Sequence, residues 1–347
     1  MEQASKHILV IRLSAMGDVA MTIPVIKAMV RTYPNVKITV VSRAFLKPIF
    51  QNIPNVSFYT ADVKGKHKGI LGLFKLYKEL KKLNIDLVAD LHNVLRSKIL
   101  GAYFKLGGYK VCKIDKGRAA KKALTKTEGK ILKQLKTTHE RYADVFSKLG
   151  HQVELTNKDV LAQLKTTQKI DLFIGETKKK RIGIAPFAAF DGKTYPTGQM
   201  EAVIAKLSEA KNYKIVLFGG PADKKQLVAW ESNYKNVVNA AGLFSFEEEL
   251  ILISNLDLML SMDSGNAHLA AMFGKKVITI WGITHPFAGF YPFGQPQENA
   301  LLADREQYPL LPTSIYGNKY PEGYENVMQT ITPHAVFDKI VEVVDKV

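Results

Sequence analysis

The sequence has little cysteine and no long apolar run. A single cysteine, Cys112, excludes an internal disulfide and is typical of a small core residue in a reducing compartment. No apolar run approaches the ~18–20 residues of a membrane span, and the first residues, MEQASKHILVIRL, lack the apolar region of a signal peptide. We therefore expect a cytoplasmic protein.

Two kinds of binding motif are also missing. The G-x-G-x-x-G fingerprint of dinucleotide-binding proteins is absent, which counts against an NAD or FAD enzyme, and we expect no cofactor. Nothing resembles a helix-turn-helix, an aromatic RNA-binding signature or a zinc module, so nucleic acid is the weakest candidate for a partner.

What the chain has in excess is positive charge, with a formal net charge of +17. Much of it lies in two groups with few acids between their members. The first group is Lys64, Lys66, Lys68, Lys75, Lys78, Lys81 and Lys82, and the second is Lys113, Lys116, Arg118, Lys121, Lys122, Lys126, Lys130, Lys133 and Lys136. They form either a solvated face that keeps the protein soluble or a surface for an anionic partner, such as acidic lipid or a phosphorylated substrate.

The order of apolar runs predicts parallel sheets. Short β-rich runs at 7–13, 37–42, 56–60, 85–91 and 109–115 alternate with helical spacing at 24–33, 71–83 and 93–104. The second half repeats the pattern, with strands at 181–187, 214–220, 236–242, 256–263 and 276–282 and helices near 198–210, 222–233, 245–255 and 265–273. Such alternation indicates parallel sheets covered on both faces.

We therefore predict an α/β protein of two doubly wound, Rossmann-like domains that face a cleft. A polar, lysine-rich stretch at about 151–180 separates the two halves, and we place the domains at 1–165 and 166–331.

Ser245 and Glu248 form a capping box, which predicts the start of one helix. Thr332 and Pro333 begin a terminal helix, 332–347, after a long loop (283–331), and we expect this helix to pack on the N-terminal domain.

Polar residues follow several predicted strands. In open parallel sheets, ligands bind beyond the carboxyl ends of the strands, where loops enter helices. The first such turn, RLSAMGDVAMTIP, carries Gly17 and Asp18, and from this segment alone Asp18 is either a helix cap or a functional carboxylate.

Three turns of the second half have the same character. The stretch SMDSGNAHLAAMFGKKVITIWG sets Asp263, Ser264, Gly265 and His268 where a buried strand ends; free N–H groups at a helix start suit an anion, and Asp263 suits sugar hydroxyls. APFAAFDGKTYP offers Lys193, and LFGGPADKK offers Asp223 as a ribose-hydroxyl acceptor. The alternatives are a capped helix with a satisfied histidine and a solvated lysine.

The order of these turns resembles glycosyltransferase family 9, the ADP-heptose:lipopolysaccharide heptosyltransferases. The matching stretches are IRLSAMGDVAMTIPVIKAM, DLHNVLRS, IAPFAAFDGKTYP, LFGGPAD and SMDSGNAHLAAMFGKKVITIWG. The resemblance implies the two-domain GT-B architecture, with the acceptor in the N-terminal domain and the nucleotide sugar in the C-terminal one. It also implies inverting transfer without a metal, and the chain has no Asp-x-Asp pair for a divalent ion.

The resemblance also implies roles for individual residues. Asp18 would be the general base that deprotonates the acceptor hydroxyl, and Lys193 would neutralise the diphosphate leaving group. Asp263 would hold sugar hydroxyls, and Asp223 would lie at the ribose. The turn on the diphosphate side would be formed by Ser264, Gly265 and His268. The expected acceptor-side residues are Ser14, Gly17, His92, Asn93 and Arg96, although Arg96 is equally compatible with a structural salt bridge.

The chain departs from the family where many members carry hydroxyl residues shortly before the lysine. Those places are Ala188 and Ala189 here, and Tyr195 stands where a tryptophan is common. We expect transfer of a heptose or related sugar from an ADP-sugar to a lipid-linked saccharide of the lipopolysaccharide core, with peripheral binding to the anionic cytoplasmic face of the inner membrane. Alternatives are a same-fold transferase with another donor or acceptor and a nucleotide-sugar-binding protein without turnover.

Overall fold

A computed structural model describes residues 6–175 and 178–345, which divide into two compact units. Unit 1 is Met1–Lys116 with Thr138–Leu161, and unit 2 is Gly117–Thr137 with Ala162–Val347. The sequence analysis placed one boundary at 165/166. It did not foresee that residues 117–137 leave the first unit and join the second.

Unit 1 is built on a five-stranded parallel sheet in the order β3-β2-β1-β4-β5. Its strands are β1 (His7–Ile11), β2 (Lys37–Ser42), β3 (Val56–Thr60), β4 (Leu87–Asp90) and β5 (Lys110–Lys113). The predicted strands at 37–42 and 56–60 match, while the others end earlier because their last residues already turn into the loops at the sheet edge.

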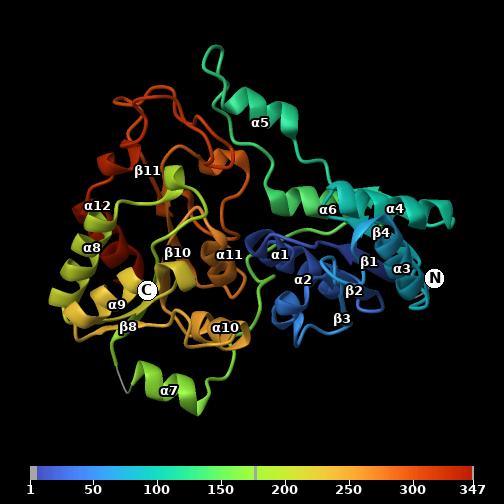
Figure 1. The fold of residues 1–347 in the computed structure, drawn as a ribbon, viewed down its shortest axis with the longest axis horizontal. Coiled ribbons are helices and arrows are strands. Elements are labelled where there is room, and N and C mark those ends of the chain that lie inside the picture. Colours follow the sequence, from blue (N-terminus) through green and yellow to red (C-terminus); the bar gives the residue numbers. More distant parts are fainter. Residues whose placement is uncertain (1–5, 176–177, 346–347) are drawn as a thin grey trace. The chain divides into compact units, whose positions relative to one another are not determined.

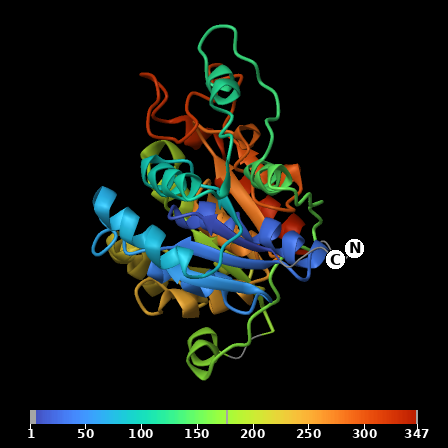
Figure 2. The ribbon, with the colours of Figure 1, turned by 90° about the vertical axis from the view of Figure 1, so that its right-hand side faces the viewer.

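The helices of unit 1 cover both faces of this sheet (Figures 1 and 2). They are α1 (Met16–Ala20), α2 (Ile23–Thr32), α3 (Gly69–Lys81), α4 (Leu95–Leu106) and α6 (Thr138–Lys148), with a 3₁₀ segment at Ala44–Phe50. α3 packs against α4, and α2 packs against α6. The chain crosses from β1 toward the β3 edge of the sheet, and later from β3 toward the β5 edge. Because both crossovers are right-handed, the α2–α6 pair and the α3–α4 pair lie on opposite faces.

Unit 2 repeats the design with a six-stranded parallel sheet in the order β11-β10-β9-β6-β7-β8. Its strands are β6 (Lys180–Ala185), β7 (Tyr213–Leu217), β8 (Val237–Asn239), β9 (Leu258–Met262), β10 (Lys276–Trp281) and β11 (Ala300–Leu302). The sequence analysis missed β11, because three residues inside a long polar and proline-containing stretch give no periodic signal.

The helices of unit 2 are α5 (Arg118–Leu124), α7 (Gln168–Ile174), α8 (Thr197–Glu209), α9 (Lys224–Asn233), α10 (Phe246–Ser254), α11 (Gly265–Ala271) and α12 (Pro333–Asp345). Short 3₁₀ segments lie at Asp191–Lys193 (η2), Pro221–Asp223 (η3), Pro286–Ala288, Gln297–Asn299 and Val327–Thr330. The capping box of α10 is present: Ser245 Oγ accepts from the Glu248 N–H at 3.3 Å, and Glu248 accepts from the Ser245 N–H at 2.8 Å.

The terminal helix does not pack where the sequence analysis expected. α12 lies against α8, β9 and β10 of unit 2, and its residues Val336, Ile340, Val343 and Val344 are part of the core of that unit. The physical reason is the apolar stripe at i, i+4, i+7 and i+8, which needs an apolar surface, and α8 presents one. Thr332 caps the helix by accepting from the Ala335 N–H at 3.2 Å.

Two further expectations concern the burial of Cys112 and the presence of membrane-spanning helices. Cys112 lies on β5 at the edge of its sheet and is half-buried, so it is not the core residue that the sequence predicted. Among the residues that the structure describes, no helix has the length and hydropathy to cross a membrane.

Candidate functional site

The turn after β1 carries Asp18, the predicted base. Asp18 lies in the first turn of α1, where its Oδ2 accepts from the Ala15 N–H at 3.3 Å and forms an ion pair with Arg12 Nη2. The Asp18 side chain is 29% exposed, whereas the Arg12 side chain is 7% exposed. The carboxylate is therefore both a local cap and the reachable end of a buried ion pair.

Arg12 is a residue of this site that sequence reasoning missed. Its Nη1 donates to the Leu91 carbonyl at 2.8 Å, and its guanidinium carbon lies 5.9 Å from the Tyr142 ring centre. The Tyr142 hydroxyl donates to the Asp18 carbonyl oxygen at 3.2 Å. The sequence did contain a signal for Arg12, namely an arginine between apolar residues at the end of a predicted buried strand. A buried charge needs a partner, so such an arginine indicates a nearby carboxylate.

The turn after β4 is organised by Asp90, also missed. Its carboxylate accepts from the backbone N–H groups of His92 at 2.9 Å and Asn93 at 2.8 Å, and from Ser97 Oγ at 3.1 Å. Burial raises the pKa of Asp90, while these hydrogen bonds act in the opposite direction. The group is a structural clamp that fixes where His92 and Asn93 lie.

The predicted acceptor-side residues have different properties in the structure. Burial, assisted by the positive charge of Arg12, lowers the pKa of His92 to about 3, so its ring is neutral near pH 7. Asn93 donates its side-chain amide to the Ile114 carbonyl at 2.8 Å. Arg96 is exposed, and no ion pair of Arg96 occurs within the described residues. Ser14 is half-buried and Gly17 is buried beside Asp18.

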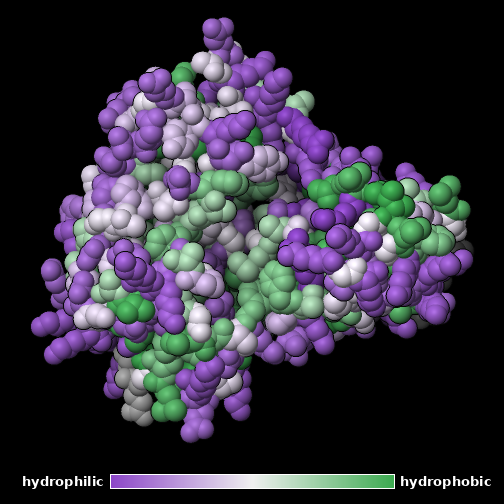
Figure 3. Space-filling model, in the orientation of Figure 1, coloured by the Kyte–Doolittle hydropathy of each residue, from purple (hydrophilic) through white to green (hydrophobic). Residues whose placement is uncertain are grey.

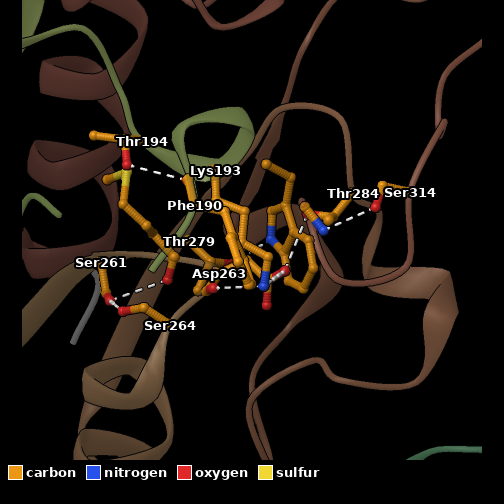
Figure 4. Close-up of polar contacts among 12 residues, drawn as sticks. Phe190, Lys193, Thr194, Ser261, Asp263, Ser264, Thr279, Thr284 and Ser314 are labelled. Carbon is orange, nitrogen blue, oxygen red and sulfur yellow. Dashed lines mark hydrogen bonds and ion pairs between the residues drawn. The ribbon is translucent and has the colours of Figure 1, made fainter. Parts of the chain in front are cut away.

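In unit 2, the ends of β6 and β9 bring Lys193 and Asp263 together (Figure 4). Lys193 Nζ lies 2.7 Å from Asp263 Oδ2 and donates to the Asp263 carbonyl at 3.1 Å. Thr284 Oγ1, after β10, donates to the same carboxylate oxygen at 3.0 Å. Thr284 was not among the predicted residues, although a polar residue directly after a strand of this sheet was a usable signal.

The turn from β9 into α11 holds the other predicted residues. Ser264 is the residue before the first turn of α11, and its Oγ lies 3.0 Å from Ser261 Oγ. Gly265 begins the helix, and His268 is buried on it with 8% of its surface exposed. Asp263, Ser264, Gly265 and His268 thus share one strand-to-helix turn, as the sequence predicted.

Asp223 lies at the end of β7, in a separate turn. Its Oδ2 accepts from the Gly220 N–H at 2.8 Å, and a Cβ on Gly219 would lie 2.7 Å from Leu227 Cδ1 and 3.1 Å from Asp223 Cβ. Asp223 therefore caps its own loop, and within the described residues no hydrogen bond or ion pair joins it to Lys193 or Asp263. No group of three or more His, Cys, Asp or Glu suited to hold a metal ion occurs among the described residues.

A cavity of about 400 Å³ opens beside η2 in unit 2, lined by residues 189–192 and 317–320. The second wall belongs to the loop that follows β11, which the sequence analysis treated only as a connection. The arrangement gives unit 2 a cation, a carboxylate and hydroxyls at adjacent strand ends, which suits a ligand carrying both phosphate and hydroxyl groups.

Curated heptosyltransferases resemble this chain along most of its length. The chain is 24% identical over 295 residues to the lipopolysaccharide core heptosyltransferase OpsX of Haemophilus influenzae, covering 82% of this chain and 81% of that protein. It is 28% identical over 319 residues to lipopolysaccharide heptosyltransferase 3 of Escherichia coli, covering 86% and 87%.

Solved structures share the fold along nearly the whole chain. A glycosyl transferase family 9 protein from Veillonella parvula superposes with a TM-score of 0.76 at 21% identity, covering 99% of this chain and 98% of that one. The E. coli heptosyltransferase WaaC with ADP gives a TM-score of 0.68 at 19% identity, with 97% and 99% covered. The model of glycosyltransferase family 9 (heptosyltransferase) matches residues 73–316. Because this match covers well over half of the chain, the protein is a glycosyltransferase, and the chain belongs to glycosyltransferase family 9.

Proposed function

We propose that the protein transfers a heptose, or a related sugar, from an ADP-sugar to a saccharide acceptor of the lipopolysaccharide core. The observation that carries the proposal is the Lys193–Asp263 pair at adjacent strand ends, within the part of the chain that the family model matches. Support comes from the relatives, which are named as lipopolysaccharide heptosyltransferases, and from a structural neighbour solved with ADP.

In the proposed reaction, an acceptor hydroxyl attacks the anomeric carbon of the donor while the bond from that carbon to the diphosphate oxygen breaks. The Asp18 carboxylate accepts the hydroxyl proton, since an alcohol is too weak a nucleophile unaided. ADP leaves with the electron pair of the broken bond, and the configuration at the anomeric carbon inverts.

Lys193 meets the charge that develops on the leaving diphosphate, a role that a fixed ammonium in a low-dielectric site fills without a metal. Asp263 accepts hydrogen bonds from donor-sugar hydroxyls, Ser264, Gly265 and His268 line the diphosphate, and Asp223 binds the ribose. Because Asp263 and Lys193 form an ion pair, a diphosphate bound at Lys193 would compete with Asp263 for the ammonium.

On the acceptor side, His92 and Asn93 serve as hydrogen-bonding groups, and Arg96 supplies charge toward an anionic acceptor. The neutral state of His92 follows from its lowered pKa of about 3. Arg12 holds the Asp18 carboxylate in one orientation through their ion pair.

We further propose that unit 1 binds anionic membranes peripherally through the first turns of α3. Ile70 and Leu71 are 63% and 84% exposed there, and Leu106 at the end of α4 is 86% exposed. Tyr103 of α4 donates to the Ile70 carbonyl at 3.3 Å, so the two helix ends are neighbours, and apolar surface is visible over this part of unit 1 in Figure 3. The first lysine group (residues 64–82) lies along α3 and the loop before it, and basic residues near exposed apolar ones suit acidic headgroups over a bilayer.

The competing function is a same-fold transferase with another donor, which the alanines at 188 and 189 favour because they remove two hydroxyl donors. The test is acceptor-dependent release of nucleoside diphosphate from ADP-, UDP-, GDP- and CMP-sugars, with the mass of the acceptor measured. Transfer from an ADP-sugar alone supports the proposal. Transfer from a UDP-sugar alone supports the competitor, and donor binding without transfer indicates a binding protein.

A further inference from the structure

Gly317 lies in direct contact with the site lysine, although 124 residues separate the two in the sequence. A Cβ built on Gly317 would lie 2.4 Å from Lys193 Cγ, 2.9 Å from Cδ and 2.7 Å from Cε. The backbone of Gly317 therefore touches nearly the whole aliphatic part of Lys193. No other residue type fits here without moving that side chain.

The loop that carries Gly317 is anchored to the strand end next to Asp263. The backbone N–H groups of Thr313 and Ser314 donate to the Ile283 carbonyl at 3.0 and 3.2 Å, and Ser314 Oγ accepts from the Gly317 N–H at 2.9 Å (Figure 4). Ile283 directly precedes Thr284, the residue that donates to Asp263. One anchored loop therefore faces Lys193 while the residue after its anchor faces Asp263.

The same close packing continues on the other side of Lys193. A Cβ on Gly192 would lie 2.2 Å from Ile283 Cδ1 and 3.0 Å from the Gly317 carbonyl oxygen. η2 is thus enclosed between the end of β10 and the loop 313–317. A lysine side chain has about 2 kcal/mol of rotamer entropy to lose when it is fixed, and this enclosure restricts the rotamers of Lys193.

From these contacts we propose that Gly317 is a positioning residue, which holds the Lys193 ammonium at Asp263 by closing the loop on the lysine methylenes. This inference rests on the proposed role of Lys193 in leaving-group stabilisation. The neighbouring cavity of about 400 Å³, walled by residues 189–192 and 317–320, is where a displaced lysine would have space to move. Residues 317–320 lie beyond the stretch matched by the family model, which ends at residue 316.

The chain offers a matched control at Gly323. Gly317 has φ +80° and Gly323 has φ +82°, so an alanine strains the backbone equally at both, but nothing lies within 4 Å of a Cβ on Gly323. Gly323→Ala therefore reports the cost of the backbone alone. Gly317→Ala reports that cost together with displacement of Lys193.

The experiment is a double-mutant cycle of Gly317→Ala with Lys193→Ala, read out by kcat, donor KM and thermal unfolding. We expect Gly317→Ala to lower kcat by about 10- to 100-fold, as for a catalytic group displaced by about 1 Å, with a smaller change in donor KM. Gly323→Ala should keep the parental kcat. In the Lys193→Ala background, Gly317→Ala should lower neither kcat nor the melting temperature by more than Gly323→Ala does, because the atoms it would displace are gone.

Two outcomes would overturn the inference. One is a Gly317→Ala protein with the kcat of Gly323→Ala, and the other is an effect of Gly317→Ala on melting that is equal with and without the Lys193 side chain. The melting cycle needs no turnover. If the parent protein transfers no sugar, the proposed function fails, and the melting cycle still decides whether Gly317 and Lys193 are coupled.

Discussion

The Lys193 ammonium lies 2.7 Å from the Asp263 carboxylate, and only 15% and 6% of the two side chains are exposed. The pair joins two residues that are 70 positions apart in the sequence. Since each charge is neutralised by the other, the site contains no unpaired buried charge at either residue.

Lys193→Ala should lower kcat by about 10²–10³-fold, because the lysine meets charge that grows toward the transition state. The donor KM should change by a smaller factor. Steady-state kinetics with varied donor measures both, and Lys180→Ala, which removes an exposed lysine of the same unit, is the control. A change confined to KM would instead make Lys193 a ground-state phosphate ligand.

ADP should raise the melting temperature more than UDP or GDP at equal concentration, because a ligand of the folded state stabilises it by mass action. The shift should be small, since Ala188 and Ala189 supply no hydroxyl donors to the phosphates. Differential scanning fluorimetry measures it. A larger shift with UDP would refute the ADP-sugar assignment.

Leu71→Ser should weaken binding to anionic vesicles by roughly 10- to 100-fold, because burying one leucine side chain contributes about 1.5–3 kcal/mol. Leu172→Ser is the matched control, since Leu172 is 75% exposed but lies in unit 2. Flotation with neutral and anionic liposomes measures the effect, and added salt should reduce binding because it screens the lysines over roughly 8–10 Å. Equal recovery on both liposome types would contradict membrane docking.

Glu79→Gln should destabilise unit 1 near pH 7 and lose its effect in acid. Hydrogen bonds, of which that from Tyr59 at 2.5 Å matters most, lower the pKa of Glu79 to about 2. A depressed folded-state pKa contributes stability above the unfolded value of about 4.5 and loses it as pH falls toward 2. Denaturant titrations should show a difference on the order of 1 kcal/mol at pH 7, shrinking below pH 4.5; a pH-independent difference would contradict this linkage.

The fold followed from the sequence where a local pattern carried it. Alternating apolar runs predicted most strands, and the capping box at Ser245 predicted the start of α10. By contrast, β11 has three residues and depends on its neighbour β10, and the place of α12 depends on the apolar surface of α8. Both are tertiary effects that a window of sequence does not contain.

The site was predictable to a similar extent. Asp263, Ser264, Gly265 and His268 lie close together in the sequence, so a single strand-to-helix turn predicts that they share a site. Arg12 and Thr284 were missed although polar residues at the ends of buried strands were a usable signal, whereas Gly317 was missed because its contact with Lys193 joins two distant segments. Such a contact becomes visible only when the chain has folded.

The central claim is that Asp18 is the base of a sugar transfer, and Asp18→Asn tests it most directly. The measurement is the single-turnover rate of transfer from an ADP-sugar to a lipopolysaccharide-core acceptor, made on folded protein because the variant also loses its ion pair with Arg12. The account predicts a rate lower by about 10²–10⁴-fold, the usual contribution of positioned proton transfer, with ADP binding nearly unchanged. A near-normal rate in Asp18→Asn would contradict it.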